Sequence, residues 1–160
     1  MLLDRRIAHI KKMEAHKRQK FGQEINLTVK TNPVGCTHCG YDKTYNTSTN
    51  PNCVYCGGKY WIYTETKYNE FVVVKFITEL EQYAKEAGGL QIGDAILSAR
   101  IEAMDYFKNI MQYKTRIEVD PYGTSATPIT NPSLLTVLAV SPTTLRTEIR
   151  VHCKRVTSDK

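Results

Sequence analysis

Apolar side chains recur at helical spacing at the start of the chain. They are Leu3, Ile7, Ile10 and Met13, and basic residues fill most of the positions between them. A repeat of three to four residues predicts an amphipathic helix from Leu2 to about Lys20. Phe21-Gly22 is expected to end it, because glycine is common just after the last turn of a helix.

Later segments either alternate apolar and polar residues or are dense in β-branched and aromatic residues, and both patterns are typical of strands. In chain order, the predicted strands cover residues 24–30, 59–67, 71–77, 90–97, 113–119, 134–140 and 145–153. Asn32-Pro33 is expected to break the first strand, and residues 95–108 could instead continue as a helix. Short strands with short connections predict a mainly β fold, a small antiparallel barrel or sandwich.

Four cysteines lie between the first two predicted strands with the spacing C-x2-C-x13-C-x2-C. They are Cys36, Cys39, Cys53 and Cys56, and a glycine follows each pair, Gly40 and Gly57. Each C-x2-C turn presents two sulfurs on one side of a tight loop, and two such turns complete a tetrahedral site. The glycines suit a backbone with a positive φ after the second cysteine. The spacing predicts a structural Zn²⁺ bound by all four cysteines in a zinc ribbon, and two disulfides are the alternative.

The domain organisation follows from this module. Residues 31–60 are too few to bury a core, so metal binding would supply their folding energy. We expect them to be a zinc-ribbon insertion in a β-barrel body of residues 23–156, with a polar turn or short hairpin at 41–52. The basic amphipathic helix, residues 1–22, precedes this body, and a polar tail, residues 157–160, follows it.

Positive charge is concentrated at the N-terminus. Residues 1–20 hold seven basic side chains against Asp4 and Glu14, a net charge of +5, so the rest of the chain contributes only +1 to the total of +6. The basic residues are Arg5, Arg6, Lys11, Lys12, Lys17, Arg18 and Lys20. They are candidates for contact with a protein partner, DNA or anionic lipid, and a solvated helix face is an equally good interpretation.

The sequence gives no sign of export or membrane insertion. No apolar run of signal-peptide length follows the N-terminal charges, and no stretch approaches the roughly 18 apolar residues that span a membrane. Cysteines kept reduced for metal, with Cys153 alone and distant, suit a reducing cytoplasm.

No set of polar side chains predicts catalysis. His38 lies between two zinc cysteines, where a side chain that is not a ligand usually points to solvent. His9 and His16 would share a helix face without carboxylate partners. His152 adjoins Cys153, but neighbours on a strand point to opposite faces. Four cysteines would also fill every coordination position of the zinc. We therefore expect that the protein is not an enzyme.

Four segments in the second half of the chain resemble a known family. They read Gly89-Leu-Gln-Ile-Gly-Asp-Ala-Ile-Leu97, Thr115-Arg-Ile-Glu-Val-Asp120, Val137-Leu-Ala-Val-Ser-Pro142 and Arg150-Val-His-Cys-Lys-Arg-Val156. In this order they resemble the head-to-tail joining proteins of tailed bacteriophages, the stopper or head-closure family. The stretch 98–112 is longer and more helix-like than that family's pattern, and the zinc ribbon is an addition to it.

The resemblance implies a virion protein of the phage neck, assembled in the host cytoplasm. Its small β-barrel would form a homo-oligomeric ring below the portal and contribute to closure of the DNA channel. The implied partners are further copies of the chain, the portal or its adaptor, and tail-tube or terminator proteins, with DNA in the lumen and no membrane.

The alternative hypothesis is a zinc-ribbon protein that binds nucleic acid. Zinc ribbons recur in transcription and replication proteins, and the basic helix would supply charge that attracts phosphates. The aromatic residues near the cysteines are Tyr41, Tyr45, Tyr55, Tyr60, Trp61 and Tyr63. They could stack on bases or could simply pack the hairpin.

Overall fold

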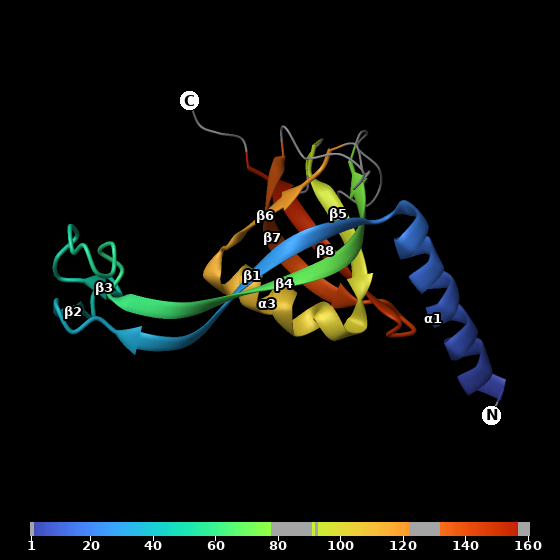
Figure 1. Ribbon diagram of the computed structural model, residues 1–160, viewed down its shortest axis with the longest axis horizontal. Coiled ribbons are helices and arrows are strands. Elements are labelled where there is room, and N and C mark those ends of the chain that lie inside the picture. Colours follow the sequence, from blue (N-terminus) through green and yellow to red (C-terminus); the bar gives the residue numbers. More distant parts are fainter. Residues whose placement is uncertain (1, 78–90, 92, 122–131, 157–160) are drawn as a thin grey trace. The chain divides into compact units, whose positions relative to one another are not determined.

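An antiparallel β-sheet of six strands nearly closes into a barrel in the computed structural model, which also has an N-terminal helix (Figure 1). This confirms the predicted mainly β class. The structure describes residues 2–77, 91, 93–121 and 132–156. It divides into two compact units, Met1–Thr28 with Lys67–Lys160, and Val29–Thr66. We call the first the barrel unit and the second the cysteine unit.

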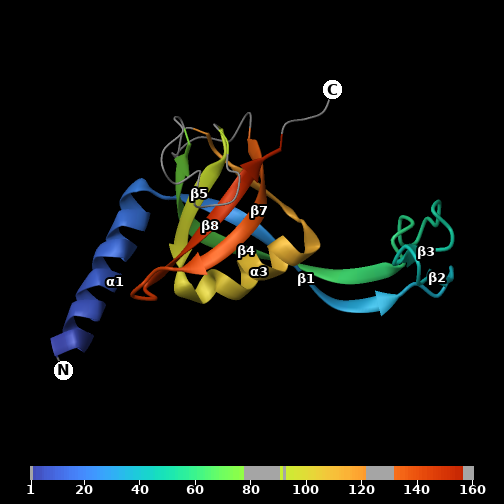
Figure 2. The same ribbon diagram turned by 180° about the vertical axis from the view of Figure 1, so that it is seen from behind.

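The strand order across the sheet is β1-β4-β5-β8-β7-β6. The strands are β1 (Gln23–Gly35), β4 (Trp61–Phe76), β5 (Ala95–Arg100), β6 (Arg116–Val119), β7 (Ser133–Pro142) and β8 (Glu148–Arg155). A register shift between Val137 and Ala139 marks a bulge in the β7–β8 pair. The β7–β8 hairpin runs beside β5 in both Figure 1 and Figure 2, as the pairing of β5 with β8 requires.

A buried side chain bridges the two end strands of this sheet. The Gln23 amide of β1 donates to the backbone carbonyl of Asp120, just beyond β6, at 3.0 Å. The backbone N–H of Asp120 donates to Gln23 Oε1 at 2.7 Å. Gln23 is only 2% exposed, so these bonds satisfy polar groups that water cannot reach. The side chain thus links the end strands at this point.

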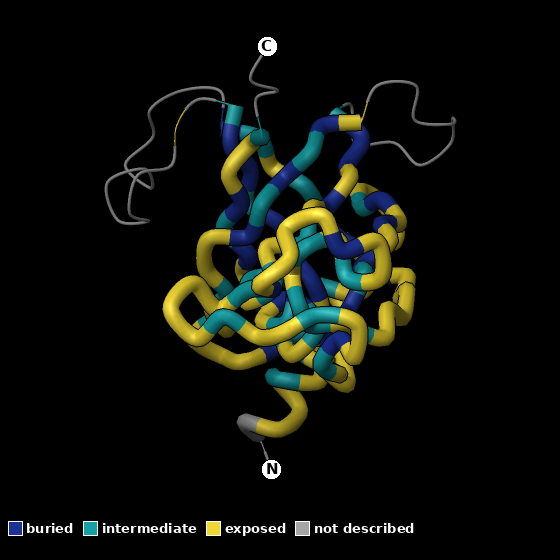
Figure 3. The backbone as a smooth tube through the Cα atoms, turned by 90° about the vertical axis from the view of Figure 1, so that its left-hand side faces the viewer, coloured by how far each residue is buried: buried dark blue, intermediate teal, exposed yellow. Residues whose placement is uncertain are grey.

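Alternate residues of the strands fill the interior, as the dark blue segments of Figure 3 show. The apolar core includes Ile25, Leu27, Val72, Leu97, Ile117, Leu135, Ile149 and Val151. Helix α3 (Met104–Tyr113) adds Phe107 and Ile110, both fully buried. A short 3₁₀ turn, η1 (Ile101–Ala103), precedes it. Residues 95–108 therefore begin as a strand and end as a helix, so each of the two predictions for them holds in part.

The predicted break at Asn32-Pro33 is wrong, because β1 continues to Gly35. Asn32 takes a positive φ of 49°, which asparagine tolerates better than most residues. Pro33 lacks an N–H, but β1 is at the end of the sheet order, where proline is tolerated.

The predicted strands at 59–67 and 71–77 are one strand, β4. Its polar middle has partners elsewhere in the barrel unit. Tyr68 stacks on Tyr106 of α3 with ring centroids 4.4 Å apart. Glu70 accepts a hydrogen bond from Arg100 Nε at 2.8 Å. These contacts allow the strand to continue through residues that resemble a loop in sequence.

The N-terminal helix α1 spans Leu2–Phe21, as predicted. Its half-buried positions are Ile7, Ile10, Glu14 and Arg18. Met13 is 60% exposed, so it does not share the half-buried face with Ile7 and Ile10, as its helical spacing had predicted. Glu14 and Arg18 lie on the half-buried face instead, because their partners there are polar. Glu14 contacts Thr147, and Arg18 contacts Glu148.

Some predictions lie outside the described residues. They concern a helical turn or loop at 78–87, most of a loop at 124–132, and the tail 157–160. Among the helices that the structure does describe, none is long and apolar enough to cross a membrane.

Candidate functional site

The four cysteines of the predicted zinc site lie together in the cysteine unit. The Sγ atoms of Cys36 and Cys53 are 3.8 Å apart, and those of Cys39 and Cys56 are 3.6 Å apart. All four sulfurs lie within 4.8 Å of one another. Four sulfurs about 2.3 Å from a tetrahedral metal would be about 3.8 Å apart. The cluster therefore has dimensions that could hold a metal ion.

One backbone hydrogen bond joins the first C-x2-C turn to a residue that follows the second turn, and another closes the second turn. Cys36 N–H donates to the carbonyl of Tyr60 at 2.9 Å, and Lys59 N–H donates to that of Cys56 at 3.1 Å. Between the turns, β2 (Tyr41–Asp42) pairs with β3 (Thr47–Ser48), which confirms a short hairpin. Ser48 N–H donates to the Gly58 carbonyl at 3.1 Å, so the hairpin is bonded to the second turn.

The positive φ predicted for the glycine after each cysteine pair is found at one turn only. Gly57 has a φ of 57°, in the left-handed region that favours glycine. Gly40 does not have a positive φ. It lies against Thr49 instead, whose backbone N–H donates to the Gly40 carbonyl at 2.9 Å. Contact with the β2–β3 hairpin, rather than backbone strain, defines the first turn.

The pKa values of Cys39 and Cys56 are shifted in opposite directions. The Ser48 hydroxyl lowers the pKa of Cys39, but desolvation and hydrogen bonds with the other three cysteines outweigh it and raise that pKa to about 12. Desolvation raises the pKa of Cys56, but hydrogen bonds from the Tyr60 backbone and the other thiols bring it down to about 6. A bound cation would favour the thiolate form of its cysteine ligands.

The aromatic residues of this unit mostly contact one another. Tyr60 lies 4.8 Å from Tyr41 and 5.1 Å from Trp61, measured between ring centroids. His38, from the first turn, stacks on Tyr55, from the second, at 3.7 Å and 15°. His38 is not part of the cysteine cluster. Packing within the hairpin therefore accounts for most of these rings.

Cys153 has no suitable environment for a nucleophile. It is fully buried, and desolvation, followed by the charge of Asp94, raises its pKa to about 12. His152 is half-buried, and desolvation together with Arg150 lowers its pKa. A thiol needs a lowered pKa to attack a substrate at neutral pH, so Cys153 serves as a core side chain.

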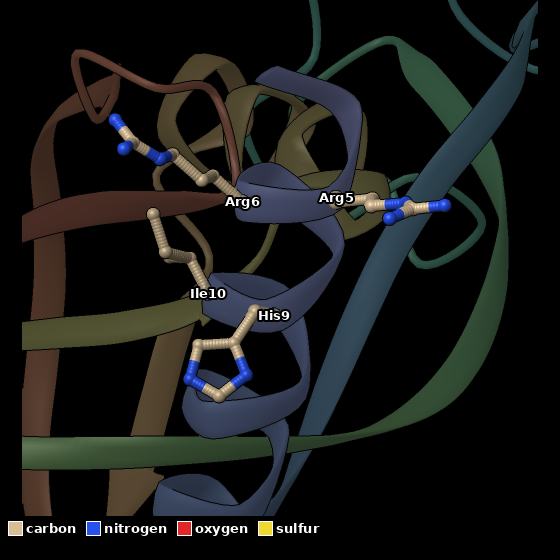
Figure 4. Close-up of a pocket in the computed structure, with 4 residues that line it drawn as sticks. All are labelled: Arg5, Arg6, His9 and Ile10. Carbon is tan, nitrogen blue, oxygen red and sulfur yellow. The ribbon is translucent and has the colours of Figure 1, made fainter. Parts of the chain in front are cut away.

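The basic residues of α1 do not form one pocket. A shallow hollow on the helix is lined by Arg5, Arg6, His9 and Ile10 (Figure 4). Arg5 and Arg6 extend to opposite sides of the helix, so their guanidinium groups do not converge on one ligand. Of the seven basic candidates, Arg18 alone is half-buried, with its side chain 13% exposed and 3.7 Å from Glu148.

A second hollow lies beside Arg18, Asn69, Glu70 and Arg100. Arg100 donates to the Glu70 carboxylate, and Arg18 pairs with Glu148. Burial raises the pKa of Glu70, although the hydrogen bond and charge of Arg100 oppose this shift. Each arginine thus lies within ion-pair distance of a carboxylate, although Nη1 of Arg18 makes no hydrogen bond to the described residues. The Glu70–Arg100 pair could not be recognised from the sequence, since the two residues are 30 positions apart.

Asp94 is a second polar residue whose role the sequence did not reveal. It is 3% exposed. One carboxylate oxygen accepts from the backbone N–H of Gln91, and the other from that of Arg155, both at 2.7 Å. Gly93, with a φ of 94°, turns the chain just before it. Gly93-Asp94, part of the first segment that resembles the stopper family, thus connects the end of β8 to the residues just before β5 by hydrogen bonds.

Comparison of the chain with protein-family models, with curated proteins and with solved structures gave no significant match.

Proposed function

We propose that the cysteine cluster binds one structural Zn²⁺. Four thiolates in a tetrahedral arrangement suit zinc or iron, and the four sulfurs would fill every position around the ion. With no position open to substrate, the metal would hold the C-x2-C turns together rather than take part in chemistry. The observation that supports this is the spacing of the sulfurs, 3.6 and 3.8 Å within the two close pairs.

Metal analysis of the purified protein tests this assignment. Elemental mass spectrometry should find one zinc per chain, and a Cys53→Ser, Cys56→Ser variant should find none. One iron per chain, with visible thiolate-to-iron absorption, would contradict zinc but keep the metal site. Disulfides detected by mass mapping of Cys36–Cys53 or Cys39–Cys56 would contradict the metal site itself.

We further propose that the protein is a structural component of a tailed-phage neck, which assembles as a ring below the portal and contributes to closure of the DNA channel. The sequence resemblance to the stopper family is one support, and the small antiparallel barrel is of the kind that it implied. The proposed partners are further copies of the chain and the adjoining portal, adaptor and tail proteins.

The observation that best supports assembly is the apolar surface of the cysteine unit. Its exposed large apolar residues are Val34, Tyr41, Tyr45, Val54, Tyr55 and Ile62. Val54 is 88% exposed and Tyr45 is 77% exposed. A unit fixed in shape by a metal can present such side chains to a neighbour at little cost in conformational entropy. We propose that the neighbour is a second copy, bound head to tail, because only that kind of contact produces a ring.

The native mass of the protein, measured by light scattering and native mass spectrometry, tests the assembly proposal. We expect a closed oligomer of one stoichiometry, which Val54→Ser with Tyr45→Ser should convert to smaller species. Leu138→Ser is the matched control, since Leu138 is 41% exposed on the barrel unit. A monomer at all concentrations, alone and with portal protein, would contradict the proposal.

A further inference from the structure

Helix α1 separates its charges between two faces. On the inner face, Glu14 Oε1 accepts a hydrogen bond from Thr147 Oγ1 at 2.9 Å, and Arg18 pairs with Glu148 at 3.7 Å. Ile7 and Ile10 are half-buried on the same face. Residues 1–20 contain two acids and seven cations, and one of each, Glu14 and Arg18, is therefore paired with Thr147 and Glu148.

The outer face and the two flanks of the helix share the remaining positive charge equally, three cations on the outer face and three on the flanks. Arg5, His9, Lys12, His16 and Lys20 follow one another at intervals of four, three, four and four residues, and every one is exposed. This spacing places them on one side of the helix, about half a turn from the inner face. Arg6, Lys11 and Lys17 are exposed on the flanks, so six exposed cations stand against the single acid Asp4.

We propose that this outer face binds duplex nucleic acid through its phosphate backbone. The 20 residues of the helix give it a length of about 30 Å, which matches roughly nine base pairs of DNA. The outer face has about one cation for every two turns, and the three flanking cations raise this to about one per turn, so several can neutralise phosphates at once. Such contacts carry no sequence information, and the binding is therefore independent of sequence.

The composition of the outer face favours a duplex over two other partners. A helix that lies on a membrane needs a broad apolar face opposite its charges. Here Ile7 and Ile10 instead share the inner face with the Glu14 and Arg18 contacts. Proteins that bind single strands add aromatic rings on which bases stack. The outer-face positions hold only arginine, lysine and histidine, so they can contact phosphates but offer no phenyl, phenol or indole ring.

Unlike the zinc-ribbon hypothesis, which uses both the basic helix and the rings near the cysteines, the proposal gives the cysteine unit no part in nucleic-acid contact. The cysteine unit has few basic residues, and Tyr41, Tyr60 and Trp61 contact one another. The α1 surface also does not depend on ring assembly. A failure to bind DNA would leave the assembly proposal standing, and the native mass would decide that question separately.

Fluorescence anisotropy of a labelled random-sequence duplex of about 30 base pairs tests the proposal with the full chain. Binding should weaken steeply with salt, because each neutralised phosphate contributes about −0.9 to the slope of log K against log salt. The variant Arg5→Gln, Lys12→Gln, Lys20→Gln should lose up to about 2.7 of that slope and roughly tenfold or more in affinity near 0.1 M salt.

The matched control removes the same charge from the barrel unit. Lys108→Gln, Arg116→Gln, Lys154→Gln alters three exposed cations and lowers the net charge by the same amount. It should change affinity by less than about threefold. Equal losses in the two variants would show that net charge alone attracts DNA, and this would overturn the proposal. So would a flat anisotropy signal from the unaltered protein at low salt, or binding to anionic vesicles without binding to the duplex.

Discussion

The barrel unit and the cysteine unit are stabilised in different ways. The barrel unit has a continuous apolar core in which Leu97, Phe107, Ile117 and many other side chains are fully buried. The described burial in the cysteine unit is far smaller and includes Cys36 and Cys53 themselves. A chain segment that buries so little cannot offset its conformational entropy by packing alone. Packing therefore stabilises the barrel unit, and under the proposed zinc assignment metal binding would fold the cysteine unit.

The largest expected effect comes from removal of the metal ligands. Cys53→Ser with Cys56→Ser should unfold the cysteine unit, because zinc supplies about 10–16 kcal/mol in comparable small modules. The barrel unit should keep its thermal transition. Calorimetry and circular dichroism of the double variant measure this, and Cys153→Ala is the control for loss of a cysteine that is not a ligand. Loss of both units in the double variant would remove the distinction drawn above.

A substitution in the apolar core should destabilise only the barrel unit. Phe107→Ala removes a fully buried ring and should lower the free energy of unfolding of that unit by about 3–5 kcal/mol. Zinc content per chain should not change. Denaturant unfolding measures the free energy of unfolding, and metal analysis measures the zinc content. A loss of zinc in Phe107→Ala would show that the two units fold together.

Asp94 gives a smaller effect within the barrel unit. Asp94→Ala removes the acceptor for two backbone N–H groups, from Gln91 and Arg155. Hydrogen bonds to charged groups contribute about 1.5–3 kcal/mol each, so the loss should be about 2–4 kcal/mol after partial relaxation. Asp94→Asn keeps one acceptor oxygen and should cost less. Similar costs for alanine and asparagine in denaturant unfolding would contradict this role.

The smallest effect concerns pH and the Glu70–Arg100 pair. Burial raises the pKa of Glu70, so the protonated form is favoured in the folded state. The resulting stabilisation is present below the unfolded value near 4.5 and is lost as pH rises through the folded pKa. Glu70→Gln should make the unfolding free energy less dependent on pH in that window.

Arg100→Ala should have the opposite effect on the same profile. It leaves a buried carboxylate without its partner, raises the Glu70 pKa further and should cost about 1–3 kcal/mol at pH 7. Arg100→Lys is the control, because it retains the positive charge. Identical pH profiles for the unaltered protein and Glu70→Gln would show that Glu70 is not the group responsible.

The cysteine cluster and most strands could be predicted because their signals are local. Four cysteines at C-x2-C spacing, or Ile25 and Leu27 alternating with polar residues, need no knowledge of distant partners. The continuity of β4 could not be predicted, since residues 68–70 are polar and their partners Tyr106 and Arg100 come much later in the chain. For the same reason the apolar face of α1 could be predicted at Ile7 and Ile10 but not its continuation through Glu14 and Arg18, whose partners Thr147 and Glu148 are distant in the chain.

Hydrogen exchange with and without a zinc chelator tests the central claim most directly. The amides of residues 29–66 should lose their protection when the metal is removed, while those of β5 and β8 should keep theirs. Unchanged protection in residues 29–66 after complete metal removal would contradict the claim that metal folds this unit. Loss of protection in β5 and β8 as well would contradict the claim that the barrel unit folds by its own core.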